Sequence, residues 1–207
     1  MKTGRTLSIA LGAVLLTHTA ANAALVGVTL DPFPDLFSSF LDVTYDESID
    51  ELLVSGFPTT YTPDNMTGPQ NVLGPNQSFT IDLTVDNAGV ASGGSLSVMG
   101  NVLSSGPDLL QADLLDFGFI DPPGGEIFDF LFVVSGGDLA ADFGGIGATI
   151  GVILDINDPG AFDGTFDSDF ATTGAAGVSD TGVPEPTSIF LLGVAAGALF
   201  LRRRARV

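Results

Sequence analysis

The feature that most constrains the fold is an alternation of apolar and polar residues that recurs in short runs between residues 24 and 182. Side chains of a β-strand point alternately to the two faces of a sheet, so a period of two indicates strands with one buried face. Clusters of Gly, Pro, Asn and Asp, which favour turns, separate the runs. We expect strands at residues 25–30, 40–45, 49–56, 78–85, 95–103, 109–120, 127–134 and 146–156.

This pattern predicts an all-β domain. Short strands at fairly regular spacing favour an antiparallel β-sandwich, with a jelly-roll-like arrangement or a barrel as the alternative. Residues 40–45 and 49–56 are expected to pair as a hairpin around Asp46-Glu47-Ser48. Residues 57–76 contain four prolines among Thr, Asn and Gly, which predicts a long loop or covering segment.

The charges are distributed unevenly along the chain. All six Lys and Arg residues lie before residue 24 or after residue 201, whereas 24 of the 25 acids lie between residues 24 and 183. The formal net charge of the whole chain is −19. The central region therefore contains no Lys or Arg, and it also lacks His, Cys and Trp. It is nevertheless rich in Leu, Val, Ile and Phe, so we expect it to fold around an apolar core.

These missing residue types exclude several function classes. Without His or Lys there is no imidazole base for a serine nucleophile and no Schiff-base lysine. Sites for zinc, copper or iron that depend on His or Cys are excluded. Nucleic acid and anionic membrane surfaces need cationic groups, so neither is an expected partner of this region. Carboxylate pairs and oxygen-ligated metals remain as possible chemistry.

The first 23 residues have the pattern of a secretory signal peptide. Lys2 and Arg5 form a positive start, and an apolar stretch follows at residues 7–16. Ala21 and Ala23 supply small residues for cleavage before Ala24. The expected partners at this end are the secretion translocon and a signal peptidase.

The last 25 residues combine three features. Pro184, Glu185 and Pro186 form an extended stretch that cannot join a helix or an inner strand, because each proline lacks a backbone donor and has a fixed φ. Fifteen uncharged residues follow at positions 187–201. As a helix they would extend about 22 Å, which is short for a hydrocarbon core of about 30 Å. A cationic cluster then stops translocation at the cytoplasmic face and comprises Arg202, Arg203, Arg204 and Arg206.

At these residues the chain resembles the PEP-CTERM sorting signal, a tripartite C-terminus of exported proteins of Gram-negative bacteria. The resemblance implies that an exosortase, a membrane peptidase, recognises Pro184–Pro186 and then releases or re-attaches the passenger, which is the exported part of the chain before this motif. The ordinary alternative is a single-span tail anchor. The resemblance covers about an eighth of the chain. It implies a sorting route and no activity for the passenger.

The predicted organisation is a signal peptide at residues 1–23, an acidic β-rich domain at 24–182 and a sorting signal at 183–207. A signal helix and a hydrophobic C-terminal helix are expected to flank the domain. The second helix would hold the precursor in the inner membrane before processing. The final location is then the cell surface or the extracellular matrix, where the resemblance implies association with exopolysaccharide.

Two kinds of chemistry are conceivable within the acidic domain. The densest group of oxygen ligands could hold Ca²⁺ in a Gly-containing loop, although the order differs from that of an EF-hand and Asp and Asn are also common turn formers. Its members are Asp155, Asn157, Asp158, Asp163, Asp167 and Asp169. Carboxylate pairs for glycoside hydrolysis are the other option, but the region has no Trp and only two Tyr residues to hold a sugar.

We therefore expect a non-catalytic exported protein with a structural or interaction role, no cofactor and no assigned metal site. The alternative is an extracellular module that binds calcium or carbohydrate. The phenylalanines that recur at two-residue steps are expected to form the core, with an exposed aromatic face for carbohydrate as the less common possibility.

Overall fold

The structure is a computed structural model that describes residues 25–103, 105–120, 126–156, 161–172 and 177–184. The described residues form an all-β domain without helices. Its strands are β1 (Leu30–Asp46), β2 (Glu51–Thr62), β3 (Gln70–Asn71), β4 (Leu73–Val85), β5 (Ala91–Asn101), β6 (Asp108–Ile120), β7 (Glu126–Gly136), β8 (Thr149–Ile156), β9 (Phe170–Ala171) and β10 (Gly177–Pro184).

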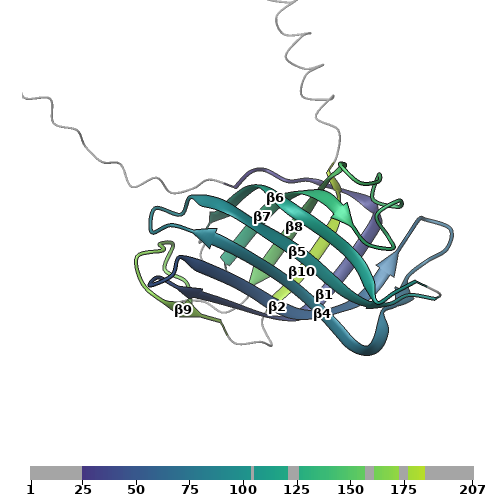
Figure 1. Ribbon diagram of the computed structural model, residues 1–207, viewed down its shortest axis with the longest axis horizontal. Coiled ribbons are helices and arrows are strands. Elements are labelled where there is room, and N and C mark those ends of the chain that lie inside the picture. Colours follow the sequence, from purple (N-terminus) through teal and green to yellow (C-terminus); the bar gives the residue numbers. More distant parts are fainter. Residues whose placement is uncertain (1–24, 104, 121–125, 157–160, 173–176, 185–207) are drawn as a thin grey trace, which may run out of the picture.

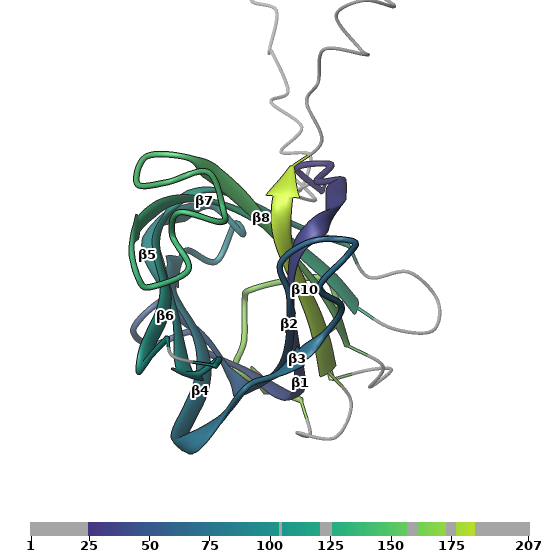
Figure 2. The same ribbon diagram turned by 90° about the vertical axis from the view of Figure 1, so that its right-hand side faces the viewer.

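Eight of these strands close into an antiparallel barrel. Apart from the two-residue strands β3 and β9, each strand pairs with the next along the chain, from β1 to β10. The last strand, β10, then pairs with β1, from Leu30 opposite Pro184 to Leu41 opposite Gly177. The strands consequently form a ring when the domain is viewed along the barrel (Figures 1 and 2). β3 adds to β2, and β9 pairs with β1 beyond the point where β10 ends.

The expected sandwich is therefore wrong, and the barrel alternative is confirmed. Alternation indicates one buried face for each strand in either architecture, so it does not distinguish them. The distinction depends on the pairing of β1 with β10, two strands that lie more than a hundred residues apart in the sequence. The two expected flanking helices lie outside the described residues.

The predicted strands are largely present, with different ends. The hairpin of β1 and β2 is confirmed. The segment 57–76, expected as a loop, instead contains the end of β2, all of β3 and the start of β4. β1 begins only at Leu30 and continues through the proline-containing residues 31–34, and β10 was not predicted.

Phenylalanine rings fill much of the barrel interior. On β7, Phe128, Phe130 and Phe132 are fully buried, in agreement with an inward-facing period of two. From the segment after β8, Phe162 packs against Phe128, and Phe166 packs against Phe119 of β6 with the ring centroids 4.9 Å apart in a T-shaped arrangement. Each such aromatic pair contributes about 0.5–1.5 kcal/mol beyond the burial of its area. These core phenylalanines confirm that the two-residue steps mark the inner face.

Two β-bulges change which residues of a strand face inward. In β1 the buried positions are even-numbered up to Ser38 and odd-numbered from Leu41, and the register with both neighbouring strands shifts at this point. In β6 the same change occurs between Ala112 and Phe117. An extra residue in one strand reverses the inward-facing set that follows it.

Candidate functional site

The predicted sorting motif lies directly after the strand that closes the barrel. Pro184 is the last residue of β10 and is paired with Leu30 at the start of β1, so the expectation that this stretch stays out of an inner strand is wrong at its first residue. The proline is tolerated because the pairing of β10 with β8 extends only to Gly182. Glu185 and Pro186 lie outside the described residues, as do Arg202, Arg203, Arg204 and Arg206. The predicted cleavage residues Ala21, Ala23 and Ala24 also lie outside them.

A buried carboxylate holds the segment that follows the predicted cleavage position. Asp129 on β7 lies between inward-facing phenylalanines and is only 3% exposed. Its Oδ1 accepts the N–H of Val26 at 2.9 Å, and its Oδ2 accepts those of Gly27 and Val28 at 2.8 and 3.2 Å. The three amides compensate the carboxylate in a domain without cationic side chains.

The acids considered for calcium do not converge in the part of the loop that the structure describes. Asp155 is exposed on β8, and Asn157 and Asp158 lie outside the described residues. The Thr165 hydroxyl lies within hydrogen-bonding distance of both Asp163 Oδ1, at 2.7 Å, and Asp167 Oδ1, at 2.8 Å, and can donate its proton to either. Asp169 accepts the backbone N–H of Glu47 at 2.8 Å. No group of three or more His, Cys, Asp or Glu residues that could hold a metal ion occurs among the described residues.

Another carboxylate, that of Glu126, lies on the inner side of β7. This side chain is fully buried, and its Oε1 accepts the backbone N–H of Phe162 at 3.4 Å. Its Oε2 has no hydrogen-bond partner within the described structure. A buried oxygen without a hydrogen-bond partner costs free energy.

An open groove lies on the barrel wall where β1, β2 and the start of β4 meet. The extra residue in β1 places Phe40 outward with a φ of 55°, and 61% of its surface is exposed. A second shift of register lies between Phe37 and Ser38, where Thr59 is the extra residue of β2. These neighbouring irregularities re-aim side chains on both strands, as bulges commonly do.

Gly56 makes room for the β1 bulge. A Cβ atom at this position would lie 2.9 Å from the carbonyl oxygen of Phe40 and would overlap the Leu41 side chain. Glycine therefore allows β2 to approach the bulged backbone closely.

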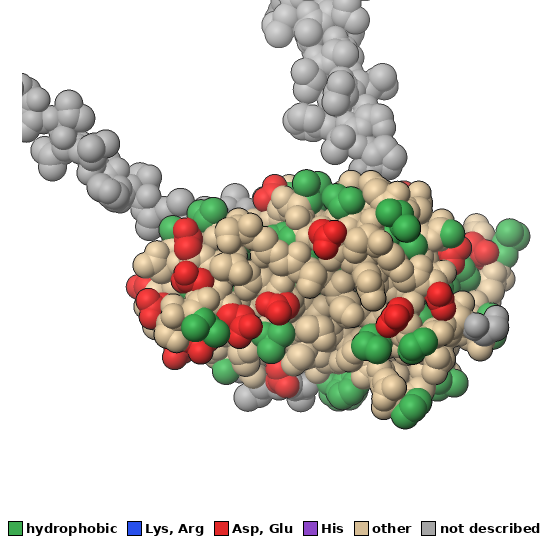
Figure 3. Space-filling model, in the orientation of Figure 1, with side chains coloured by type: hydrophobic (Ala, Val, Ile, Leu, Met, Phe, Trp, Pro, Cys, Tyr) green, Lys and Arg blue, Asp and Glu red, His purple; other side chains and the backbone are tan. Residues whose placement is uncertain are grey.

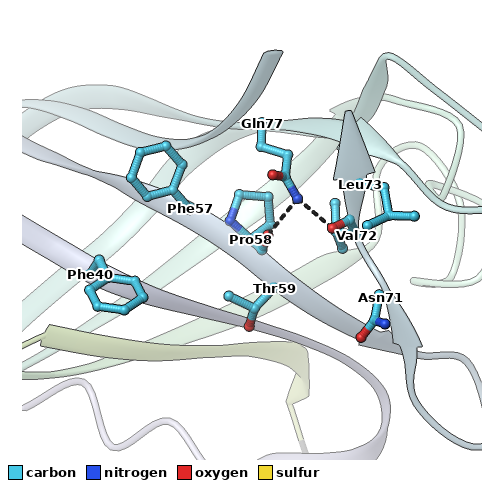
Figure 4. A pocket seen from close by; sticks show the side chains of 8 residues that line it. All are labelled: Phe40, Phe57, Pro58, Thr59, Asn71, Val72, Leu73 and Gln77. Carbon is cyan, nitrogen blue, oxygen red and sulfur yellow. Dashed lines mark hydrogen bonds between the residues drawn. The ribbon is translucent and has the colours of Figure 1, made fainter. Parts of the chain in front are cut away.

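The groove has an accessible volume of about 480 Å³, and Figure 4 shows the side chains that line it. The rings of Phe40 and Phe57 lie at one end, and Asn71 and Leu73 lie at the other (Figure 4). Phe57 is 52% exposed and Leu73 is 64% exposed. The complete lining is Phe40, Phe57, Pro58, Thr59, Asn71, Val72, Leu73 and Gln77.

Polar side chains in the groove are partly held in place. Gln77 donates its amide Nε2 to the carbonyl oxygens of Val72 and Pro58, which ties the start of β4 to β2 (Figure 4). Thr59 donates its hydroxyl to the carbonyl oxygen of Phe37 at 3.1 Å. The amide of Asn71 forms no hydrogen bond with any other described residue and is available to a ligand.

Two ionisable groups near this part of the chain, Tyr61 in β2 and Asp64 between β2 and β3, have shifted pKa values. Burial, together with a hydrogen bond to Asp142 and the charge of that residue, raises the pKa of Tyr61 well above its ordinary value of 10.0. Backbone hydrogen bonds from Thr67 and Met66, with a third from the Thr67 hydroxyl, lower the pKa of Asp64. Neither group lines the groove.

The sequence does not predict the groove, because the prolines of residues 57–76 indicate a long loop or covering segment. The signal that could have indicated it is Phe57-Pro58-Thr59 directly after an alternating run, since proline within a strand marks an edge or an irregularity. The regularly spaced phenylalanines considered for an exposed aromatic face are buried, so that possibility is wrong for them. The exposed rings beside the groove are those of Phe40 and Phe57.

By its fold, the described part is a closed, eight-stranded antiparallel barrel with a groove on its wall. The chain carries the PEP-CTERM protein-sorting motif, whose family description matches residues 182–204. The motif implies export, sorting through the membrane and processing by an exosortase, a membrane protein. The comparison with curated proteins found no match, and the comparison with solved structures found none either. Within the described residues no helix is long and apolar enough to cross a membrane.

Proposed function

We propose that the barrel is delivered to the cell surface or the extracellular matrix and acts there as a non-catalytic structural or interaction module. The observation that carries this proposal is the position of the sorting motif. It begins at residue 182, within the strand that closes the barrel, so the passenger presented for sorting is the barrel itself. A signal peptidase and the secretion translocon would act at the other end of the precursor.

The chemistry of the domain supports a non-catalytic role. Residues 24–183 contain no His, Lys, Arg or Cys, so general bases and nucleophiles other than carboxylates and hydroxyls are absent from this region. Figure 3 shows carboxylates spread over the face of the molecule that it presents. Such a surface keeps a protein soluble and repels other anionic polymers.

The test is the intact mass and the location of the protein recovered from its host. We expect a form that lacks the leader and the residues after the motif, in the surface or matrix fraction. Glu185→Ala should leave the tail attached and the protein in the membrane fraction, whereas the control Asp113→Ala, an exposed acid on β6, should be processed normally. Retention of the arginine tail in all three proteins would instead indicate a plain membrane anchor.

A further inference from the structure

We infer that the groove formed by Phe40, Phe57, Asn71 and Gln77 binds a segment of an uncharged polysaccharide. This inference names a ligand class for the interaction role proposed above and rests on that proposal for its location outside the cell. The occupant follows from the exposed rings at one end of the groove, the polar groups beyond them and the absence of charge from the lining.

The rings of Phe40 and Phe57 are held outward by the backbone. They project from adjacent strands, with Ser39 of β1 directly opposite Phe57 of β2. Phe40 also occupies the left-handed region, which disfavours a bulky residue, so its exposure carries a conformational cost. The faces of aromatic rings are electronegative and attract weakly positive C–H groups, such as those on the faces of a pyranose.

The polar groups suit hydroxyls better than ions. Asn71 offers a free amide with both donor and acceptor atoms, and the Gln77 amide is fixed through its nitrogen so that its oxygen remains an acceptor. Apolar and aromatic side chains with a few placed polar groups are typical of ligand-binding sites, and the groove has this combination.

The charge distribution selects against ionic ligands. None of the eight side chains that line the groove is charged, although the domain has 24 acids. A cationic ligand would find no carboxylate in the lining, and an anionic polymer would be repelled by the surrounding surface. An uncharged polymer with hydroxyl groups matches the exposed rings and the amide groups of this lining.

The experiment measures binding of the full-length chain, kept soluble in a polyoxyethylene detergent that contains no sugar. The probes are microcrystalline cellulose in a sedimentation assay and soluble dextran and hydroxyethylcellulose in affinity electrophoresis, with alginate as the anionic comparison. We expect retention by at least one neutral polymer, and we expect this retention to be insensitive to added NaCl because neither partner contributes opposite charges.

Groove variants should weaken this binding without unfolding the barrel. Phe40→Gly removes the ring and suits the positive φ, and Phe57→Ala and Asn71→Ala change exposed side chains. Each ring should contribute about tenfold in affinity, the usual scale for an anchoring contact. The matched control is Leu115→Ala, which removes an exposed apolar side chain (59%) from the bulge in β6 and should leave affinity unchanged.

Three results would overturn the inference: no retention by any of the neutral polymers, retention that the groove variants do not reduce, or retention by alginate alone that NaCl abolishes. The proposed function is tested separately, by location and mass in the host. A surface-delivered protein that binds no neutral polymer would refute the groove inference alone. A membrane-anchored protein that binds through the groove would refute only the delivery.

Discussion

Asp129 accepts hydrogen bonds from three consecutive amides in a domain that has no cation to pair with it. In the sequence it is one of 24 acids of the domain. It stands between Phe128 and Phe130, which face inward, so the alternation of a strand predicts that Asp129 faces outward. Its burial results from the segment 26–28, which crosses over β7. Hydrogen bonds to a charged acceptor are stronger than neutral ones, so Asp129 contributes to the stability of the barrel and holds residues 26–28 against β7.

We predict that Asp129→Asn lowers the free energy of unfolding by about 1–3 kcal/mol, because an amide nitrogen would replace an acceptor and face backbone donors. Urea unfolding followed by far-UV circular dichroism measures the change. Asp155→Asn is the matched control, since Asp155 is exposed on the neighbouring strand opposite Ile127. Equal effects of the two substitutions would show that the three amides contribute nothing specific.

At the scale of elements, hydrogen bonds from side chains connect loops to the barrel wall. The segment between β7 and β8 packs Leu139 and Phe143 inward, and the hydroxyl of Tyr61 on β2 donates to Asp142 Oδ2 at 2.7 Å. Because the folded state raises the pKa of Tyr61, its contribution to stability is complete below pH 10 and is lost as the pH rises beyond 10 toward the higher folded value.

We predict that Tyr61→Phe is less stable than the wild type at neutral pH by about 0.5–1.5 kcal/mol, the usual net contribution of one hydrogen bond. Above pH 10 its stability should decline less steeply with pH, because the variant lacks the group that must ionise. Unfolding measured at a series of alkaline pH values tests both statements. A decline as steep as that of the wild type would mean that Tyr61 is not the group responsible.

For the whole molecule, the relevant feature is the excess of negative charge. Twenty-four acids without basic side chains repel one another across a compact barrel, and dissolved salt screens this repulsion. We predict that the melting temperature rises with NaCl and that CaCl₂ at equal ionic strength has the same effect. Thermal melts in the two salts test this. A saturable increase at low CaCl₂ alone would contradict it and indicate a specific calcium site in the 155–169 region.

The sequence by itself determined the β class, most of the strands and the sorting motif, because these depend on local properties: side-chain alternation, turn residues and a short contiguous signal. It also determined that the domain is anionic. The missed strand β10 has the sequence GVSDTGVP, which contains few apolar residues, so its pairing partners define it as a strand and its own pattern does not.

Only the tertiary structure decided that the sheet closes, that Asp129 is buried and that Phe40 and Phe57 share a groove. Closure requires β1 to pair with a strand at the opposite end of the domain. The groove requires register shifts in two neighbouring strands, β1 and β2. It also requires Gly56, which lets β2 approach the bulge of β1 closely. Each of these features depends on contacts between distant residues, whose free energies have no counterpart in the local pattern of the chain.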